Sequence, residues 1–206
     1  MAITVLLHTT YSEKIGSIMA HGFRVSKRTK RGTAYDDDGK TIDEERLEAY
    51  MKSEHTLEAV REEMRPDLPS RLYSTFFQPP ETNECFENSR AASVSEDERG
   101  KPRYDFGCGR DAALVVDARR IQAQGAIGDT ALSDAVFGIY WREAIGHPAD
   151  DQEYPMESAR KFWESAKLFD ASADYPENLE CPEIWYPGTI PPTVITCRYD
   201  SNHPLP

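Results

Sequence analysis

Two short segments at opposite ends of the chain constrain its fold most. Residues 3–7 are apolar and β-branched, which predicts a buried strand that runs into His8. Near the other end, residues 183–186 predict a short aromatic strand that begins with Glu183. Prolines on both sides of this second segment limit the freedom of its backbone. A histidine and a glutamate on two strands of one sheet can meet in a site that no local motif reveals.

The elements predicted between these segments follow an irregular order. Helices are predicted over residues 11–21, 41–64, 81–88, 130–145 and 156–169, and further strands over 72–77, 112–116 and 194–198. This order lacks the βαβ rhythm of a doubly wound sheet, no GxGxxG motif follows a strand, and GxxxxGK[ST] is absent. We therefore expect one α+β domain over residues 1–206 with a mixed or split sheet. The charged helix within about 41–65 is an insertion, interpreted either as a lid or as an ordinary packing helix.

Composition narrows the classes of function. A net charge of -12 argues against a sequence-independent nucleic-acid binder, although residues 24–31 hold a basic run that reads as a solvated loop. The four cysteines lack CxxC spacing, and no metal-ligand spacing surrounds His8, so we expect no metal. With no secretory leader and no apolar run long enough to cross a bilayer, we expect a cytoplasmic protein with free thiols and no membrane partner.

The two terminal segments also carry the candidate catalytic residues. His8 is followed by the hydroxyls of Thr9 and Thr10. These three side chains are suited to hydrogen-bond and orient a ribose. Glu183 suits the stabilisation of an oxocarbenium-like transition state, as glycosidic bond cleavage requires. The alternative interpretation of His8 is a core histidine whose hydrogen bonds are made within the protein. The alternative interpretation of Glu183 is a surface glutamate at the start of a strand.

The segment before the aromatic strand at 72–77 supplies further candidates. The guanidinium of Arg71 is suited to bind a pyrophosphate through two hydrogen bonds. Ser74 follows three positions later. Tyr73, Phe76 or Phe77 is suited to stack on a nicotinamide ring. An aromatic stripe that belongs to the core is the alternative interpretation.

The order of these pieces resembles the ADP-ribosyltransferase fold, in the branch that places a histidine, an aromatic residue and a glutamate on three strands. Poly(ADP-ribose) polymerases and diphtheria-type toxins belong to this branch. Residues 7–10 look like its first-strand motif, residues 17–23 like the helix and glycine turn (Gly22) that follow, and residues 72–77 like its second strand. Residues 183–192 look similar to the closing segment of DarT-like DNA ADP-ribosyltransferase toxins.

This resemblance implies an ADP-ribosyltransferase-like split, mixed or antiparallel sheet with flanking helices. It implies NAD as the substrate, with ADP-ribose passing to a nucleic acid, a protein or water. It implies that His8, Thr9, Thr10 and Gly22 surround the ribose and nicotinamide and that Glu183 is catalytic. For a toxin of this kind, the resemblance also implies an antitoxin that inhibits it. An RNA 2′-phosphotransferase-like enzyme, or a non-catalytic module that binds NAD, ADP-ribose or a protein, remains the alternative.

Overall fold

The computed structural model describes residues 2–24, 44–82, 95–96, 100–104, 106, 110–147, 154–174 and 179–203. The strands are β1 (Val5–Thr10), β2 (Ser74–Phe77), β3 (Ser95–Glu96), β4 (Pro102–Arg103), β5 (Ala112–Asp117), β6 (Gly125–Asp129), β7 (Lys167–Phe169), β8 (Pro182–Pro187) and β9 (Ile195–Tyr199). The α-helices are α1 (Ser12–His21), α2 (Glu44–Met64), α4 (Thr130–Ala144) and α5 (Pro155–Ser165). Short 3-10 turns are η1 (Arg71–Tyr73), η2 (Pro80–Thr82), η3 (Ala118–Arg120) and η4 (Pro192–Val194).

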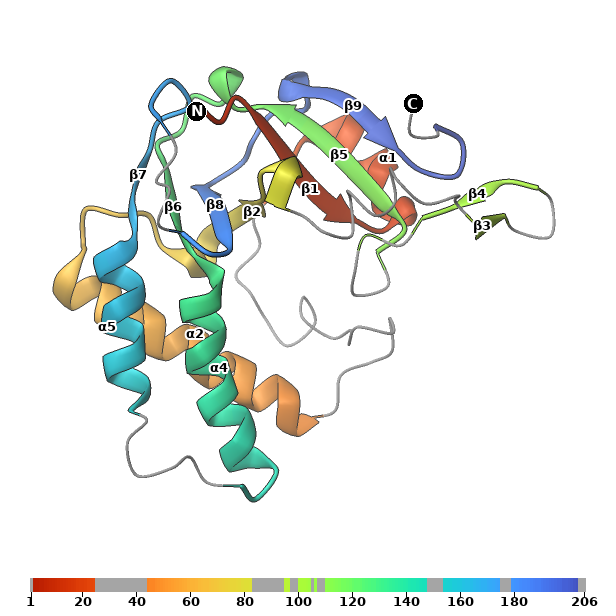
Figure 1. The fold of residues 1–206 in the computed structure, drawn as a ribbon. Coiled ribbons are helices and arrows are strands. Elements are labelled where there is room, and N and C mark those ends of the chain that lie inside the picture. The colour runs from red at the N-terminus through yellow and green to blue at the C-terminus, as the bar shows by residue number, and fades with distance from the viewer. Residues whose placement is uncertain are drawn as a thin grey trace.

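The described strands form two larger antiparallel sheets and a small hairpin. One sheet has the order β1-β5-β9, the other has the order β2-β8-β6-β7, and β3 pairs with β4. The larger sheets meet where β1 passes the end of β2, because Leu7 and Gln78 exchange two backbone hydrogen bonds of 2.8 and 2.9 Å. The α+β class is confirmed, and the pairing is antiparallel throughout the described strands. We call this junction of β1 and β2 the seam (Figure 1).

Two hydrophobic clusters lie on opposite faces of the β2-β8-β6-β7 sheet. Ile184 and Tyr186 of β8 belong to a cluster shared with Leu6 and Leu114 of the other sheet. Trp185 belongs to a second cluster, shared with residues of α2, α4 and α5. Because side chains alternate along a strand, Glu183 shares the Trp185 face of β8. The start of β8 therefore presents its carboxylate on the face that meets the helices (Figure 1).

Helix α2 is a packing helix, which decides between the two interpretations of the charged segment. Leu57 and Val60 are buried in the cluster around Trp185, and the indole of Trp163 donates to the carbonyl oxygen of Leu57 at 2.6 Å. Thr56 is also hydrogen-bonded to Tyr140 of α4 at 2.7 Å. The basic run beyond residue 24 lies outside the described residues, as do residues 83–88 of the short helix predicted over 81–88.

The start of α1 is stabilised by a residue remote in the sequence. Tyr11 occupies the N-cap position without a side-chain hydrogen bond. Ser12 is the first helical residue, and its amide and hydroxyl both donate to the Asp111 carboxylate at 2.7 Å. An acidic partner remote in the sequence therefore replaces the local cap. Gly22 ends the helix at positive φ (76°), as expected, but with an extended ψ of -175° in place of the left-handed helical value.

Strands β6 and β7 were not predicted, and the helix predicted over 156–169 was too long. The helix ends at Ser165, and Lys167–Phe169 pairs with β6. The sequence of β6 conceals a strand because it contains two glycines. A Cβ atom at Gly125 would lie 2.6 Å from the Tyr186 ring, and one at Gly128 would lie 3.1 Å from the Phe162 ring. Aromatic rings that cross the strand thus require the residue type that weakens its β signal.

No helix within the described ranges has both the length and the apolar character needed to cross a membrane.

Candidate functional site

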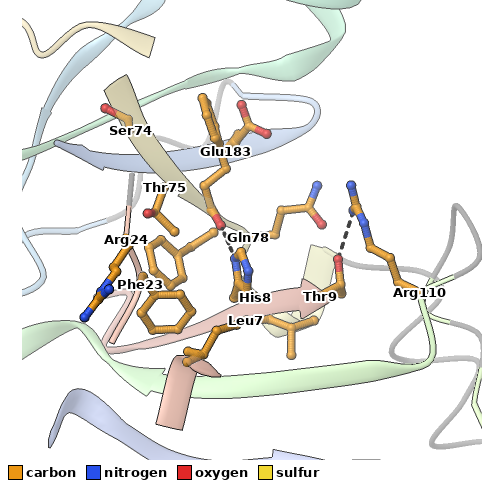
Figure 2. A pocket seen from close by; sticks show the side chains of 13 residues that line it. Leu7, His8, Thr9, Phe23, Arg24, Ser74, Thr75, Gln78, Arg110 and Glu183 are labelled. Atoms are coloured by element: carbon orange, nitrogen blue, oxygen red, sulfur yellow. Dashed lines mark hydrogen bonds between the residues drawn. The ribbon is translucent and has the colours of Figure 1, made fainter. Parts of the chain in front are cut away.

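A pocket of about 350 Å³ opens at the seam between the two sheets (Figure 2). Its walls come from β1, β2, the start of β8, α1 and the residues that follow α1, so the fold brings distant parts of the chain together here. The lining residues are Leu7, His8, Thr9, Ile18, Phe23, Arg24, Ser74, Thr75, Phe76, Phe77, Gln78, Arg110 and Glu183. His8 and Glu183 therefore face one cavity.

The ring of His8 is held in one orientation across the seam. Its Nδ1 lies 2.9 Å from the carbonyl oxygen of Phe76, and because a carbonyl oxygen only accepts, Nδ1 carries the proton (Figure 2). The rings of Phe23 and Phe77 lie 4.9 and 5.6 Å from the imidazole. Burial lowers the pKa of His8 to about 4, the bond to Phe76 opposes this shift, and nearby Arg110 adds to it. His8 is thus neutral at pH 7, with Nε2 as a hydrogen-bond acceptor.

Glu183 is held by a buried arginine. Arg71 Nη1 donates to Glu183 Oε2 at 2.8 Å, and Arg71 Nη2 lies 3.5 Å from Oε1 of Glu54 on α2. The guanidinium also lies within 4.9–5.5 Å of the centres of three aromatic rings. These rings belong to Phe76, Phe162 and Trp185. The two carboxylates raise the pKa of Arg71 against the opposing effect of burial, so it remains charged.

A third carboxylate lies within electrostatic range of this group. Burial, then Glu183, raises the pKa of Asp134 on α4 to about 6, Arg71 opposes the shift, and Glu54 and Asp129 add to it. The side chain of Asp134 is nevertheless exposed, so solvent weakens these interactions. Arg71 thus faces two carboxylates, and the one that lines the pocket, Glu183, makes this wall its acidic side.

Two arginines line the pocket away from this acidic wall. Arg110 Nη1 donates to the Thr9 hydroxyl at 3.0 Å, and Arg24 is exposed. Figure 2 shows them on opposite sides of His8. Sequence reasoning assigned Arg24 to a solvated run and missed Arg110, together with Thr75 and Gln78. No pattern distinguishes Arg110 from other loop arginines, since only the pairing of β1 with β5, which begins two residues after Arg110, brings it to Thr9.

The residues predicted for the site divide into two groups. Five line the pocket: His8, Thr9, Ser74, Phe76 and Glu183. Four are not among the lining residues: Thr10, Gly22, Arg71 and Tyr73.

Each residue of the second group lies in a defined place beside the pocket. Thr10 is buried opposite Ala112, and Tyr73 is 48% exposed on η1. Gly22 packs against the backbone of Ile190, and Arg71 meets two carboxylates in place of the expected pyrophosphate. Of the three candidate stacking residues, Phe76 and Phe77 are in the pocket wall and Tyr73 is not.

Within the described residues, no group of three or more His, Cys, Asp and Glu side chains could hold a metal ion. No protein-family model matches this chain, and comparison with curated proteins finds no match.

Proposed function

We propose that this protein is an NAD-dependent enzyme with an ADP-ribosyltransferase-like fold. It would cleave the bond between nicotinamide and ribose and pass ADP-ribose to a macromolecular acceptor or to water. The observation that supports this most is the convergence of His8 and Glu183 on one pocket, since they come from opposite ends of the chain. The split between two antiparallel sheets at this pocket supports the fold assignment.

The protonation states suit the two proposed roles. Neutral His8 offers Nε2 to a ribose hydroxyl, which donates to it and orients the sugar. Glu183 is the acidic residue among the described residues that line the pocket, and its wall of the pocket suits the cationic nicotinamide of the substrate. The same wall stabilises positive charge that develops on the ribose as the glycosidic bond lengthens.

The proposed reaction breaks one bond and forms one. The electron pair of the C1′–N bond leaves with nicotinamide, which departs as a neutral molecule. A hydroxyl, an amine or water attacks C1′, and its proton passes to Glu183 or to solvent. Phe76 and Phe23 offer apolar walls for the nicotinamide ring, and Arg24 and Arg110 offer positive charge for the pyrophosphate.

One observation favours a second candidate, a non-catalytic module that binds NAD or ADP-ribose. Glu183 Oε2 is already engaged by Arg71, which is also the state expected of a purely structural glutamate. The RNA 2′-phosphotransferase alternative gains less support, because among the described lining residues Arg24 and Arg110 are the only cations that could hold an RNA phosphate.

Release of nicotinamide separates these candidates. The protein is incubated with NAD, with and without DNA, RNA and protein acceptors, and free nicotinamide is quantified. We expect turnover by the wild type and a loss of about 10²-fold or more in Glu183→Gln. Glu180→Gln, an exposed glutamate three positions earlier, is the matched control and should keep wild-type turnover. Tight NAD binding by a wild type that releases no nicotinamide would establish the module instead.

A further inference from the structure

We infer that Arg71 is the positioning residue for Glu183, and that Glu54 fixes Arg71 in turn. This inference rests on the proposed function, because a positioning role has meaning only if Glu183 acts on a substrate. It differs from the sequence-based expectation that Arg71 binds a pyrophosphate.

The first support is the division of the guanidinium between two carboxylates. Nη1 contacts Glu183 at 2.8 Å, and Nη2 lies 3.5 Å from Glu54. The side chains of Arg71, Glu54 and Glu183 are 5%, 3% and 13% exposed, so water competes little for these contacts. The rigid planar fork therefore fixes where Glu183 Oε2 lies, which a single freely rotating contact would not do.

The second support is the aromatic enclosure of Arg71. The rings of Phe76, Phe162 and Trp185 lie within 5.5 Å of its guanidinium carbon. They belong to β2, α5 and β8, so three elements fix the plane of the guanidinium together. Trp185 is itself anchored, because its indole donates to the carbonyl oxygen of Pro69 at 2.9 Å. A site on rigid elements holds its geometry better than one on loops.

The third support is the position of Arg71 relative to the pocket. Glu183 lines the cavity, whereas Arg71 does not and is 4% exposed. A pyrophosphate could reach this guanidinium only by displacing Glu183 or Glu54. Arg71 thus binds Oε2 of Glu183 from the side away from the pocket, and Oε1 takes no part in this bond. Glu54 holds the guanidinium in place when Glu183 contacts a ligand.

The test compares turnover with binding of ADP-ribose, which contains the pyrophosphate but lacks nicotinamide. Arg71→Met alone would leave two buried carboxylates without a cation and is expected to unfold the protein. The informative variant is therefore Arg71→Met combined with Glu54→Gln, which removes opposite charges together. Glu54→Gln alone is its matched control, and Arg71→Lys retains the charge without the fork.

We expect the double variant to lose about 10²-fold in kcat relative to Glu54→Gln, with the Kd for ADP-ribose changed less than about 3-fold. Arg71→Lys should recover part of this loss, since an ammonium can still contact one oxygen. If the double variant does not fold, Arg71→Lys decides, with an expected loss of about 10-fold in kcat at unchanged ADP-ribose affinity.

Two kinds of result overturn the inference, and they differ in whether the proposed function survives. Unchanged kcat in Arg71→Lys and in the folded double variant, or a loss of ADP-ribose affinity of more than about 10-fold, removes the positioning role and leaves the proposed function standing. A wild type that releases no nicotinamide removes both.

Discussion

The imidazole of His8 on β1 donates from Nδ1 to the carbonyl oxygen of Phe76 on β2 at 2.9 Å, and this bond crosses the seam between the two sheets (Figure 2). It fixes the tautomer of a histidine whose other nitrogen accepts. It also places the backbone of Phe76 beside the pocket that His8 and Glu183 share. One hydrogen bond therefore both adds to the Leu7–Gln78 contact between the sheets and orients a side chain of the site.

The burial of His8 predicts a specific dependence of stability on pH. Its pKa is lowered from 6.5 to about 4, so between these values the unfolded chain binds a proton that the folded protein does not. The contribution of His8 is full above pH 6.5 and is lost as pH falls toward 4. We expect at most about 3 kcal/mol less free energy of unfolding at pH 4 than at pH 7.5 from this group.

Urea unfolding at several pH values between 4 and 7.5 checks this expectation. His8→Asn should show a smaller decline than the wild type, because it removes the titrating group. His147→Asn changes an exposed histidine and should reproduce the wild-type decline. Identical slopes for His8→Asn and the wild type would contradict the neutral state assigned to His8.

Gly22 is a residue where the backbone leaves no room for a side chain. Its φ is 76°, and a Cβ atom would lie 2.1 Å from the carbonyl oxygen of Ile190. That oxygen accepts from the amide of Phe23, which lines the pocket. We expect Gly22→Ala to lower the free energy of unfolding by about 3 kcal/mol or more and to weaken ADP-ribose binding.

Gly146 provides the matched control for this prediction. Its φ is 75°, yet a Cβ atom there would meet nothing within 4 Å. Gly146→Ala should therefore cost only the conformational strain, about 1 kcal/mol, and leave binding unchanged. Similar losses in the two variants would show that the contact with Ile190 has no energetic weight.

The sequence predicted the parts of the fold whose patterns are local. The apolar run of β1, the helix over 11–21 and the aromatic strand at Glu183 were read correctly to within a few residues. The cap of the turn after β5 is equally local, since the Asp117 carboxylate accepts from the amide of Arg119. These features depend on periodicity and on neighbours two or three positions away.

The missed features depend on contacts between distant parts of the chain. Glu54 is one of many acidic residues on α2, and nothing in that charged sequence marks it as buried beside Arg71. Arg110 reaches Thr9 only because β1 pairs with the distant strand β5, and β6 contains glycines because rings lie against it. The sequence could therefore indicate His8, Glu183 and Arg71 as candidates, but not that Arg71 holds Glu183.

Asp129 is expected to link the stability of α4 to the position of β8. Its carboxylate accepts from the amide of Ala131 at the start of α4 and from the amides of Glu180 and Cys181 just before β8. Asp129 is 6% exposed, so its removal leaves enclosed amide donors without partners. We expect Asp129→Ala to cost about 3 kcal/mol and to reduce nicotinamide release, because β8 carries Glu183.

The control for Asp129 is a carboxylate that makes similar bonds in solvent. Asp170 is exposed and accepts from the amide and hydroxyl of Ser172. Asp170→Ala should cost about 1 kcal/mol or less and leave turnover unchanged. Thermal unfolding and nicotinamide release are measured for both variants. Equal effects of the two substitutions would contradict the role of Asp129 in linking α4 to β8.

Asp134 predicts a change of the opposite sign to that of His8. Burial, followed by repulsion from Glu183, raises its pKa to about 6, so its ionisation costs more in the folded protein than in the unfolded chain. Its favourable contribution is present below its ordinary value of 3.8 and is lost as pH rises through 6. Asp134→Asn removes this loss and should stabilise the protein increasingly as pH rises from 4 to 7. Because the side chain is exposed, we expect a gain of only a few tenths of a kcal/mol.

Urea midpoints for the wild type and Asp134→Asn, taken as a difference at each pH, isolate this group from His8. The difference should grow between pH 4 and 7, and high salt should shrink it, since screening weakens the repulsion among the carboxylates. Glu143→Gln, which changes an exposed acid in the last turn of α4, should show no such growth. A difference that is constant with pH would mean that Glu183 and Glu54 do not act on Asp134.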